Sequence, residues 1–255
     1  MAKTVIKTGS AVGKVQSRPL LVIEFVGGPG SGKSTLAKAL IETLLLRYDS
    51  QNGTHVDHTE RRMRSHQSSL SLTLRVLLAA MSNPNLVWRA GVLFWNSQPK
   101  RCSNIRFFLS LLVYARDYPK SHGISIGNRN VNVRSQGILQ TLWSALATSE
   151  MPSCQSIRDF LSAYRFNFDH VTVHLYCPIE TALNRMRLRQ TFNSRFDRMP
   201  DHKASMILDR LTCRFPFLVD QWASGRESLT LRIDTSDSVE RNVQRLIDGI
   251  QRYLD

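Results

Sequence analysis

The sequence predicts an α/β protein: a three-layer α/β/α sandwich whose five-stranded, mostly parallel sheet is covered by helices on both faces. Apolar runs of strand length alternate along the chain with segments that carry apolar residues at helical spacing, which is the pattern of such sheets. A glycine-rich turn joins the first strand to the first helix. The length of 255 residues, 42% of them hydrophobic, allows one domain of this kind with a sizeable core.

The strands are predicted from short apolar runs that are flanked by turn residues. They span residues 20–27, 54–59, 131–133, 171–176 and 229–234. Open parallel sheets bind ligands at the carboxyl ends of their strands. We therefore expect the functional site at that edge of the sheet, where the glycine-rich turn also lies.

The helices are predicted where apolar residues recur every three or four positions. They span 33–48, 138–147, 200–223 and 239–253, and Pro178 is expected to be the first residue of another helix. The stretch 70–116 is predicted to form two or three helices broken at Pro84 and Pro99. Leu alternates with Ser or Thr over 70–74, however, which also fits a strand.

The segment from Gly27 to Thr35 reads GGPGSGKST and contains the pattern G-x-x-x-x-G-K-[S/T], which cradles phosphate groups. Glycines let the backbone bend around a phosphate, and the following helix turns its positive dipole end toward it. Lys33 is expected to reach the β- and γ-phosphates, and the Ser34 hydroxyl to ligate Mg²⁺. The predicted phosphate-binding residues are Gly28, Pro29, Gly30, Ser31, Gly32, Lys33, Ser34 and Thr35.

Four segments give the chain a resemblance to P-loop kinases of the nucleoside and nucleotide kinase type, such as thymidylate kinase-like proteins. Besides the glycine loop, residues 135–144 look like the segment after the third strand, residues 184–197 are similar to the arginine-rich lid, and residues 233–236 resemble the adenine-side loop. The resemblance implies a P-loop NTPase fold, with ATP and Mg²⁺ as cofactors and phosphoryl transfer as the reaction.

The arginines of the lid segment have a physical rationale, because phosphoryl transfer spreads negative charge that planar guanidinium groups stabilise. Arg185 and Arg189 are four residues apart and are predicted to share one helix face, whereas Arg187 points elsewhere. Arg195 and Arg198 are predicted to lie in a loop that closes over ATP. The alternative is a solvated basic helix.

One position departs from the resembled family, in which the third strand normally ends in an aspartate that holds Mg²⁺ through water. Here that position is Ser135, and the activity is expected to be weakened unless another carboxylate substitutes. Glu60 and Asp57, at the end of the predicted second strand, are the candidates. Glu60 is expected to act as general base on a substrate hydroxyl, or else to form a surface ion pair with the neighbouring arginines Arg61, Arg62 and Arg64.

The domain is predicted to span 19–255, with a helical acceptor-side insertion at about 61–116, a lid at about 185–200 and a basic flexible arm at 1–18. The arginines at 61–64 are candidates to grip an anionic acceptor. Aromatic residues of the insertion either line an apolar slot or belong to the core: Trp88, Phe94, Trp95 and Phe107.

The net charge of +14 fits either a site for two polyanions or a nucleic-acid partner, and no nucleic-acid-binding motif favours the second. Four separated cysteines indicate free thiols in a cytoplasmic protein rather than a zinc site or disulfides. A secretory signal is not expected, because residues 1–18 lack an apolar stretch, and no run of apolar residues is long enough for a membrane span.

The sequence thus predicts a cytoplasmic enzyme that transfers the γ-phosphoryl group of Mg-ATP to a small-molecule acceptor, with a nucleoside or nucleotide as one candidate. Two alternatives stay open. One is an ATP-binding or ATPase regulatory protein associated with nucleic acid. The other is a toxin-like kinase of a sugar nucleotide. A GTPase is disfavoured, because the guanine motif Asn-Lys-x-Asp is missing.

Overall fold

The computed structural model describes residues 20–48, 77–97, 105, 108–113, 124–126, 129–146, 152–164, 168–189, 196, 199–224 and 228–254. Five strands form one sheet in the order β2-β3-β1-β4-β5. Their bounds are β1 Leu20–Gly27, β2 Ile124–Ile126, β3 Arg129–Arg134, β4 Asp169–Tyr176 and β5 Ser228–Asp234. All neighbouring pairs are parallel except β2 with β3, which is antiparallel.

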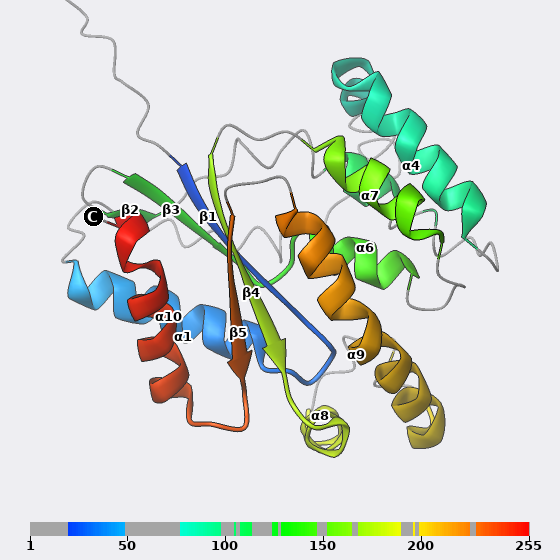
Figure 1. Ribbon diagram of the computed structural model, residues 1–255. Helices are drawn as coiled ribbons and strands as arrows, with labels where there is room; N and C mark the ends of the chain where they lie inside the picture. The colour runs from blue at the N-terminus through cyan, green and yellow to red at the C-terminus, as the bar shows by residue number, and fades with distance from the viewer. Residues whose placement is uncertain are drawn as a thin grey trace, which may run out of the picture.

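The helices cover both faces of this sheet, as Figure 1 shows. They are α1 Lys33–Arg47, α4 Pro84–Asn96, α6 Ile138–Leu146, α7 Cys154–Ser162, α8 Ile179–Arg187, α9 Asp201–Ala223 and α10 Val239–Leu254. The predicted three-layer α/β fold with a mostly parallel five-stranded sheet is confirmed, and with the glycine loop after its central strand it is a P-loop NTPase fold.

Alternation along β1 explains why both faces are apolar. Leu21, Ile23 and Phe25 belong to the core that α1 and α10 close, whereas Val22 and Val26 belong to the core with α6, α7 and α9. Successive side chains of a strand point to opposite faces, so a strand buried on both sides reads as one apolar run. Glu24 interrupts that run on the α6 and α9 side, and its side chain is completely buried.

The predicted element boundaries agree with the structure to within a few residues, with three differences. The strand predicted at 54–59 lies outside the described residues, and the fifth strand of the described sheet is β2. Helix α7 was missed. Pro178 is the cap before α8 rather than its first helical residue, because its ψ of 145° is extended.

The predicted break at Pro84 falls between two helical stretches, residues 77–82 and α4. Asn83 caps α4 by accepting a hydrogen bond from the backbone N–H of Leu86 at 3.1 Å, and Pro84 takes the first helical position, where no N–H partner is needed. The break predicted at Pro99 lies outside the described residues, as do the arm at 1–18 and the stretch 70–74.

No helix of the described residues is both long and apolar enough to cross a membrane. The buried polar groups of the sheet instead gather on one side, where β1 and β4 face α6 and α9. They include Glu24, His170, Thr172 and His174. This polar layer is the main feature of the sheet that the sequence did not predict.

Candidate functional site

The loop between β1 and α1 is fixed by close packing. Gly30 has a φ of +79°, in the left-handed region, and a Cβ atom built on it would overlap the backbone of Ala182 in α8. A larger residue is therefore excluded both by the backbone conformation and by space. Backbone hydrogen bonds close the turn, with the Ser31 N–H donating to the Gly28 carbonyl at 3.2 Å.

Lys33 places its ammonium group inside this loop. Its Nζ donates to the carbonyl oxygens of Gly27 and Gly28, each at 2.8 Å. A third, longer contact joins Nζ to the Ser31 hydroxyl at 3.5 Å. Lys33 thus lies against the backbone of the glycine loop.

The amino end of α1 opens toward the same space. Gly32 occupies the cap position with a φ of 82°, and within the described part of the chain neither a capping side-chain hydrogen bond nor an acidic first-turn residue is found there. The first backbone N–H groups of a helix lack partners within the helix and attract anions. The next two hydroxyl residues, Ser34 and Thr35, are exposed at this end. The predicted phosphate-binding residues from Gly28 to Thr35 therefore lie together.

A side chain from another helix holds the start of the loop. Gln140, in the first turn of α6, accepts a hydrogen bond from the backbone N–H of Gly27 through its Oε1 at 3.1 Å. Gln140 is 4% exposed, so this bond is protected from water. It joins β1 and α6, which are separated by 113 positions in the sequence.

Glu24 stabilises the helix that carries Gln140. Its Oε1 accepts hydrogen bonds from the backbone N–H groups of Leu139 at 2.9 Å and Gln140 at 3.5 Å. A buried carboxylate is costly unless it is hydrogen-bonded, and a helix amino end supplies both donors and a favourable dipole. Glu24 thereby fixes the beginning of α6 relative to the strand that leads into the glycine loop.

The other oxygen of Glu24 faces His170 of β4. His170 Nε2 lies 3.4 Å from Glu24 Oε2. The indole N–H of Trp222, in α9, donates to His170 Nδ1 at 3.3 Å. Because Nδ1 accepts this bond, the ring proton is assigned to Nε2, next to the carboxylate. Burial and the charge of Glu24 raise the pKa of the nearby Tyr164 phenol well above its ordinary value.

Arg185 lies on the other side of the glycine loop. From α8 it donates to the Thr235 hydroxyl at 3.0 Å and to the Thr235 carbonyl oxygen at 2.6 Å. A Cβ atom on Gly32 would lie 3.9 Å from Arg185 Nη1. The guanidinium group thus holds the loop after β5, which is the segment predicted to lie on the adenine side, and lies near the amino end of α1.

The prediction that Arg185 and Arg189 share one helix face is wrong. Helix α8 ends at Arg187 with Leu188 as its cap, and the Arg189 N–H donates to the Met186 carbonyl in a tighter turn. Arg189 therefore lies beyond the helix and is exposed. Arg187 does point elsewhere, forming a 2.5 Å ion pair with Asp201 at the start of α9.

A small cavity of about 30 Å³ lies beside the glycine loop, between the end of β4 and helices α8 and α9. His174 lines it together with Gly28, Cys177, Leu208 and Phe215. Burial, followed by the charge of Arg232, lowers the pKa of His174 to about 4, so the ring is neutral at pH 7. Its ring stacks on Phe215 with 5.6 Å between centroids. Burial likewise raises the pKa of the Cys177 thiol.

Ser135 immediately follows β3, as predicted, and is buried. In the parallel pairing of β1 with β3, Glu24 lies beside Arg134. Ser135 therefore follows the strand that neighbours β1, and β1 leads into the glycine loop. Within the described ranges, no group of three or more His, Cys, Asp and Glu side chains could hold a metal ion. Ser34, the residue predicted to ligate Mg²⁺, is exposed at the amino end of α1.

Several predicted site residues lie outside the described residues: Asp57, Glu60, Arg61, Arg62, Arg64, Phe107, Arg195 and Arg198. The described aromatic residues of the insertion divide into two kinds. Phe94 packs edge-on against Phe108, with ring centroids 5.2 Å apart. Trp88 and Trp95 are instead 73% and 69% exposed, so neither belongs to the core.

Sequence reasoning missed Glu24, Gln140 and His174. A signal existed only for Glu24, which is the one charged residue within the apolar run of β1. The other two are polar residues on elements with apolar periodicity. Their importance depends on which elements the fold brings together, and that information is not local in the sequence.

No protein-family model matches this chain, and no curated protein matches it in sequence. Two solved structures resemble it in general architecture. A deoxyadenosine kinase from M. mycoides, solved with dCMP and a flexible dCDP as products, has a TM-score of 0.47 and 10% identity, covering 91% of this chain and 99% of its own. A shikimate kinase from Bacteroides thetaiotaomicron has a TM-score of 0.43 and 15% identity, covering 91% and 98%.

Proposed function

We propose that this protein is a phosphotransferase that moves the γ-phosphoryl group of ATP to a small-molecule acceptor. The observation that carries the proposal is the position of Lys33, whose ammonium group lies against a glycine loop at the amino end of α1. A positive charge and the backbone N–H groups of a helix amino end are suited to a polyphosphate.

Residues around the loop are suited to the two halves of ATP. Lys33 contacts the β- and γ-phosphates in this proposal, and the Ser34 hydroxyl ligates Mg²⁺, which would neutralise charge on the phosphates. In this proposal Thr235 lies on the adenine side, and Arg185, which donates to the Thr235 hydroxyl, is a lid residue. Arg185 also lies near enough to Gly32 to stabilise charge on the phosphates.

The acceptor is proposed to be a nucleoside, a nucleotide or another small hydroxyl compound. Glu60 is the proposed general base, and Arg189 and Arg195 are the proposed lid residues that close over the transferring group. The roles of these three residues are inferred from the sequence pattern and belong to the same proposal. The proposed location is cytoplasmic.

The test is an acceptor screen with the full chain and Mg-ATP. Nucleosides, nucleoside monophosphates and small hydroxylated acids are supplied in turn, and ADP and the phosphorylated acceptor are separated and quantified. The proposal predicts ADP formation that depends on one class of acceptor and stops when Mg²⁺ is chelated. ATP binding without acceptor-dependent ADP throughout the panel would count decisively against it.

A second candidate is an ATP-binding regulatory protein that associates with nucleic acid. Ser135 in place of a magnesium-holding carboxylate, together with the net charge of +14, favours it. ATP hydrolysis that rises when RNA or DNA is added, and falls steeply with salt, would support this candidate. Hydrolysis that is indifferent to nucleic acid would exclude it.

A further inference from the structure

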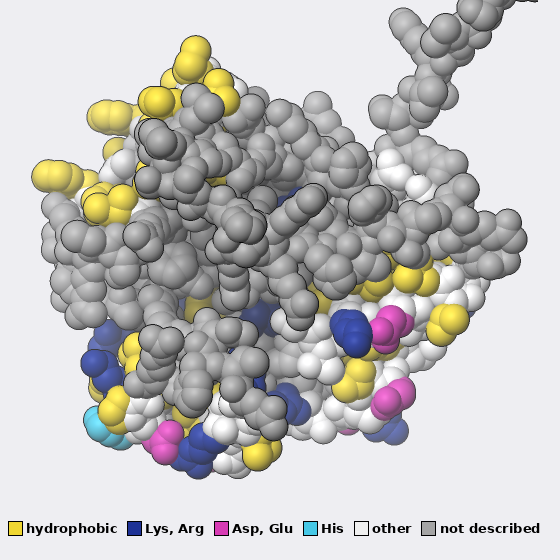
Figure 2. All heavy atoms as spheres, turned by 180° about the vertical axis from the view of Figure 1, so that it is seen from behind, with side chains coloured by type: hydrophobic (Ala, Val, Ile, Leu, Met, Phe, Trp, Pro, Cys, Tyr) yellow, Lys and Arg dark blue, Asp and Glu magenta, His cyan; other side chains and the backbone are white. Residues whose placement is uncertain are grey.

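Glu24 carries a charge where charged side chains are otherwise absent. Among the described residues it is the only Asp, Glu, Lys or Arg side chain that is buried. The others are exposed or half-buried, and Figure 2 shows acidic and basic groups close together on one face of the surface. A buried carboxylate costs free energy unless its oxygens have hydrogen-bonding partners. The groups around Glu24 therefore have to compensate this cost.

The two carboxylate oxygens of Glu24 have different partners. Oε1 accepts hydrogen bonds from the backbone N–H groups at the beginning of α6, whereas Oε2 lies 3.4 Å from Nε2 of His170. In the pairing of β1 with β4, Glu24 lies beside Thr172, and His170 comes two positions earlier on the same face of the sheet. His170 is thus the partner that β4 supplies to Oε2.

His170 is itself oriented from α9. The indole N–H of Trp222 donates to Nδ1 of His170 at 3.3 Å, and the Thr172 hydroxyl lies 3.4 Å from the same nitrogen. A neutral imidazole has one N–H donor and one acceptor nitrogen. Because Nδ1 serves as the acceptor, the proton is on Nε2 and is directed at the carboxylate of Glu24.

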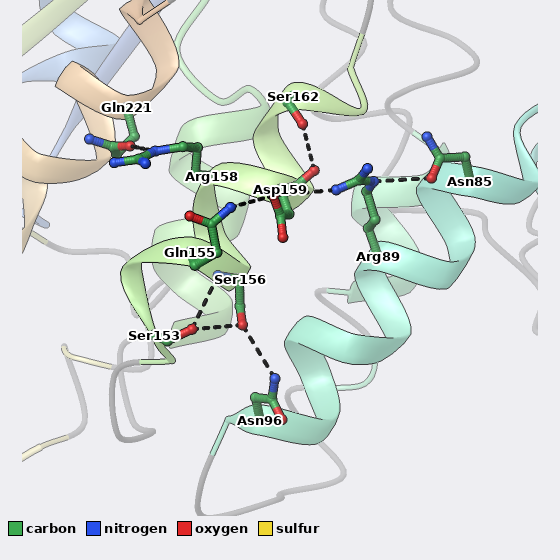
Figure 3. Close-up of polar contacts among 10 residues, drawn as sticks. All are labelled: Asn85, Arg89, Asn96, Ser153, Gln155, Ser156, Arg158, Asp159, Ser162 and Gln221. Carbon is green, nitrogen blue, oxygen red and sulfur yellow. Dashed lines mark hydrogen bonds and ion pairs between the residues drawn. The ribbon is translucent and has the colours of Figure 1, made fainter.

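The end of α9 that carries Trp222 is attached to the neighbouring helix α7. Gln221, the residue before Trp222, accepts a hydrogen bond from Arg158 of α7 at 2.8 Å, as the close-up in Figure 3 shows. The same view shows α7 joined to α4, where Asn96 donates to the Ser156 hydroxyl at 3.3 Å. Trp222 therefore has a fixed position from which it orients His170.

Polar contacts thus run without a gap from α9 to the glycine loop. We call the residues that make them the buried chain: Trp222, His170, Glu24, Gln140 and Gly27. The buried chain joins α9, β4, β1 and α6, and it ends at the first residue of the loop. Its four side chains are at most 4% exposed, so water does not compete for these contacts and each one matters more than it would at the surface.

We infer that His170 is a positioning residue for the glycine loop, and that it acts through Glu24 and Gln140 rather than by touching the nucleotide. Without the Nε2 donor, Oε2 of Glu24 has one partner fewer, and the carboxylate has to move to find another. Oε1 moves with it, the amino end of α6 is no longer fixed, and Gln140 no longer holds the Gly27 N–H. This role rests on the proposed function, in which the loop binds the phosphates of ATP.

Two measurements on the full chain test the inference, and the first needs no nucleotide. Hydrogen exchange of the Gly27 amide, followed by NMR, should be roughly threefold to tenfold faster in His170→Phe than in the wild type, which corresponds to one weakened hydrogen bond. The dissociation constant for Mg-ATP, from calorimetric titration, should rise by a similar factor. His170→Gln should stay within about twofold of the wild type in both, because its amide can donate to Glu24 and accept from Trp222.

A double variant separates positioning from a general loss of stability. Because His170 acts through Gln140, adding His170→Phe to Gln140→Met should raise the dissociation constant for Mg-ATP by less than about 1.5-fold. Tyr164→Phe is the control, since Tyr164 packs against Trp222 and donates to the Leu111 carbonyl at 2.8 Å. Loss of that buried hydrogen bond should lower the melting temperature and leave Gly27 exchange and ATP binding unchanged.

Gly27 exchange at the same rate in the wild type and in His170→Phe overturns the inference. A double variant in which His170→Phe has its full effect also overturns it, because His170 then acts independently of Gln140. A wild-type protein that does not bind Mg-ATP refutes the proposed function instead, and Gly27 exchange still decides whether His170 positions the loop. Melting curves show whether each variant folds, and His170→Met, which also lacks the donor, replaces His170→Phe if that variant does not.

Discussion

The side chain of Gln140 accepts a hydrogen bond from the backbone N–H of Gly27 at 3.1 Å, and so fixes the first residue of the glycine loop to the first turn of α6. Glu24 in turn holds α6 by accepting a hydrogen bond from the Leu139 N–H. Two buried side chains, those of Gln140 and Glu24, therefore position the loop. This support, rather than the loop sequence alone, determines how precisely the loop presents its donors.

Replacing Gln140 by methionine should therefore weaken nucleotide binding while preserving the fold. The Gly27 N–H would lose its acceptor, so ATP would have to order a looser loop on binding; an ordering cost of about 1.4 kcal/mol, the size of one hydrogen bond, corresponds to roughly tenfold in the dissociation constant for ATP. The dissociation constant is measured by calorimetric titration. Thr141→Val is the matched control, because Thr141 is equally buried but donates its hydroxyl to the Gly137 carbonyl in its own helix. Equal effects in both variants would contradict the role of Gln140.

Lys33→Ala should abolish phosphoryl transfer without unfolding the protein. The ammonium group contacts two loop carbonyl oxygens and is only partly buried, so its loss removes charge from the loop and little packing. A turnover at least about 100-fold lower is expected, as for other preorganised electrostatic contacts. Turnover is measured with the acceptor that the screen identifies, and thermal melting is compared with the wild type. Unchanged turnover would overturn the assignment of the loop as the reactive site.

Gly137→Ala should destabilise the protein, because a Cβ atom there would overlap the carboxylate of Glu24. That carboxylate is fully buried and hydrogen-bonded, and cannot move aside without losing its partners. A loss of about 1–3 kcal/mol in the free energy of unfolding is expected, measured by urea denaturation. Gly28→Ala is the control, since an added Cβ there meets only Leu208 at an ordinary 3.5 Å. Its stability should change by less than about 0.5 kcal/mol.

Acid should destabilise the protein partly through His174. Its pKa is about 4 in the folded state, below the ordinary value of 6.5, because burial and then Arg232 disfavour the charged ring. The unfolded chain therefore binds a proton first, and stability falls as the pH falls from about 6.5 to about 4. The loss amounts to about 3 kcal/mol, at about 1.4 kcal/mol for each pH unit.

His174→Phe removes this titration and keeps an aromatic ring against Phe215. Its free energy of unfolding should depend less on pH than that of the wild type between pH 7 and pH 4.5, as followed by urea denaturation at each pH. Identical pH profiles for the two proteins would show that other groups cause the acid sensitivity.

The sequence predicted much of the fold because its signals are local. Gly27–Thr35 combines a loop pattern with a strand before it and a helix after it, and the structure places all three as expected. Arg185 was predicted to be a site residue, but its contact with Thr235 was not predicted. That contact, like Gln140 with Gly27, joins segments far apart in the chain. Its formation depends on the strand order, which periodicity does not determine.

Ser135→Asp provides the sharpest test of the metal site. Ser135 follows β3, beside the strand that leads into the glycine loop, which is where the resembled kinases hold Mg²⁺ through a carboxylate. If Ser135 occupies that position, the added carboxylate should raise Mg²⁺-dependent turnover and lower the Mg²⁺ concentration needed for half-maximal activity. Turnover is measured across a magnesium titration, with Ser135→Asn as the uncharged control of the same size. Because Ser135 is only 8% exposed, a carboxylate without a metal partner would instead destabilise the protein. A fall in melting temperature that Mg-ATP does not reverse would therefore refute the assignment.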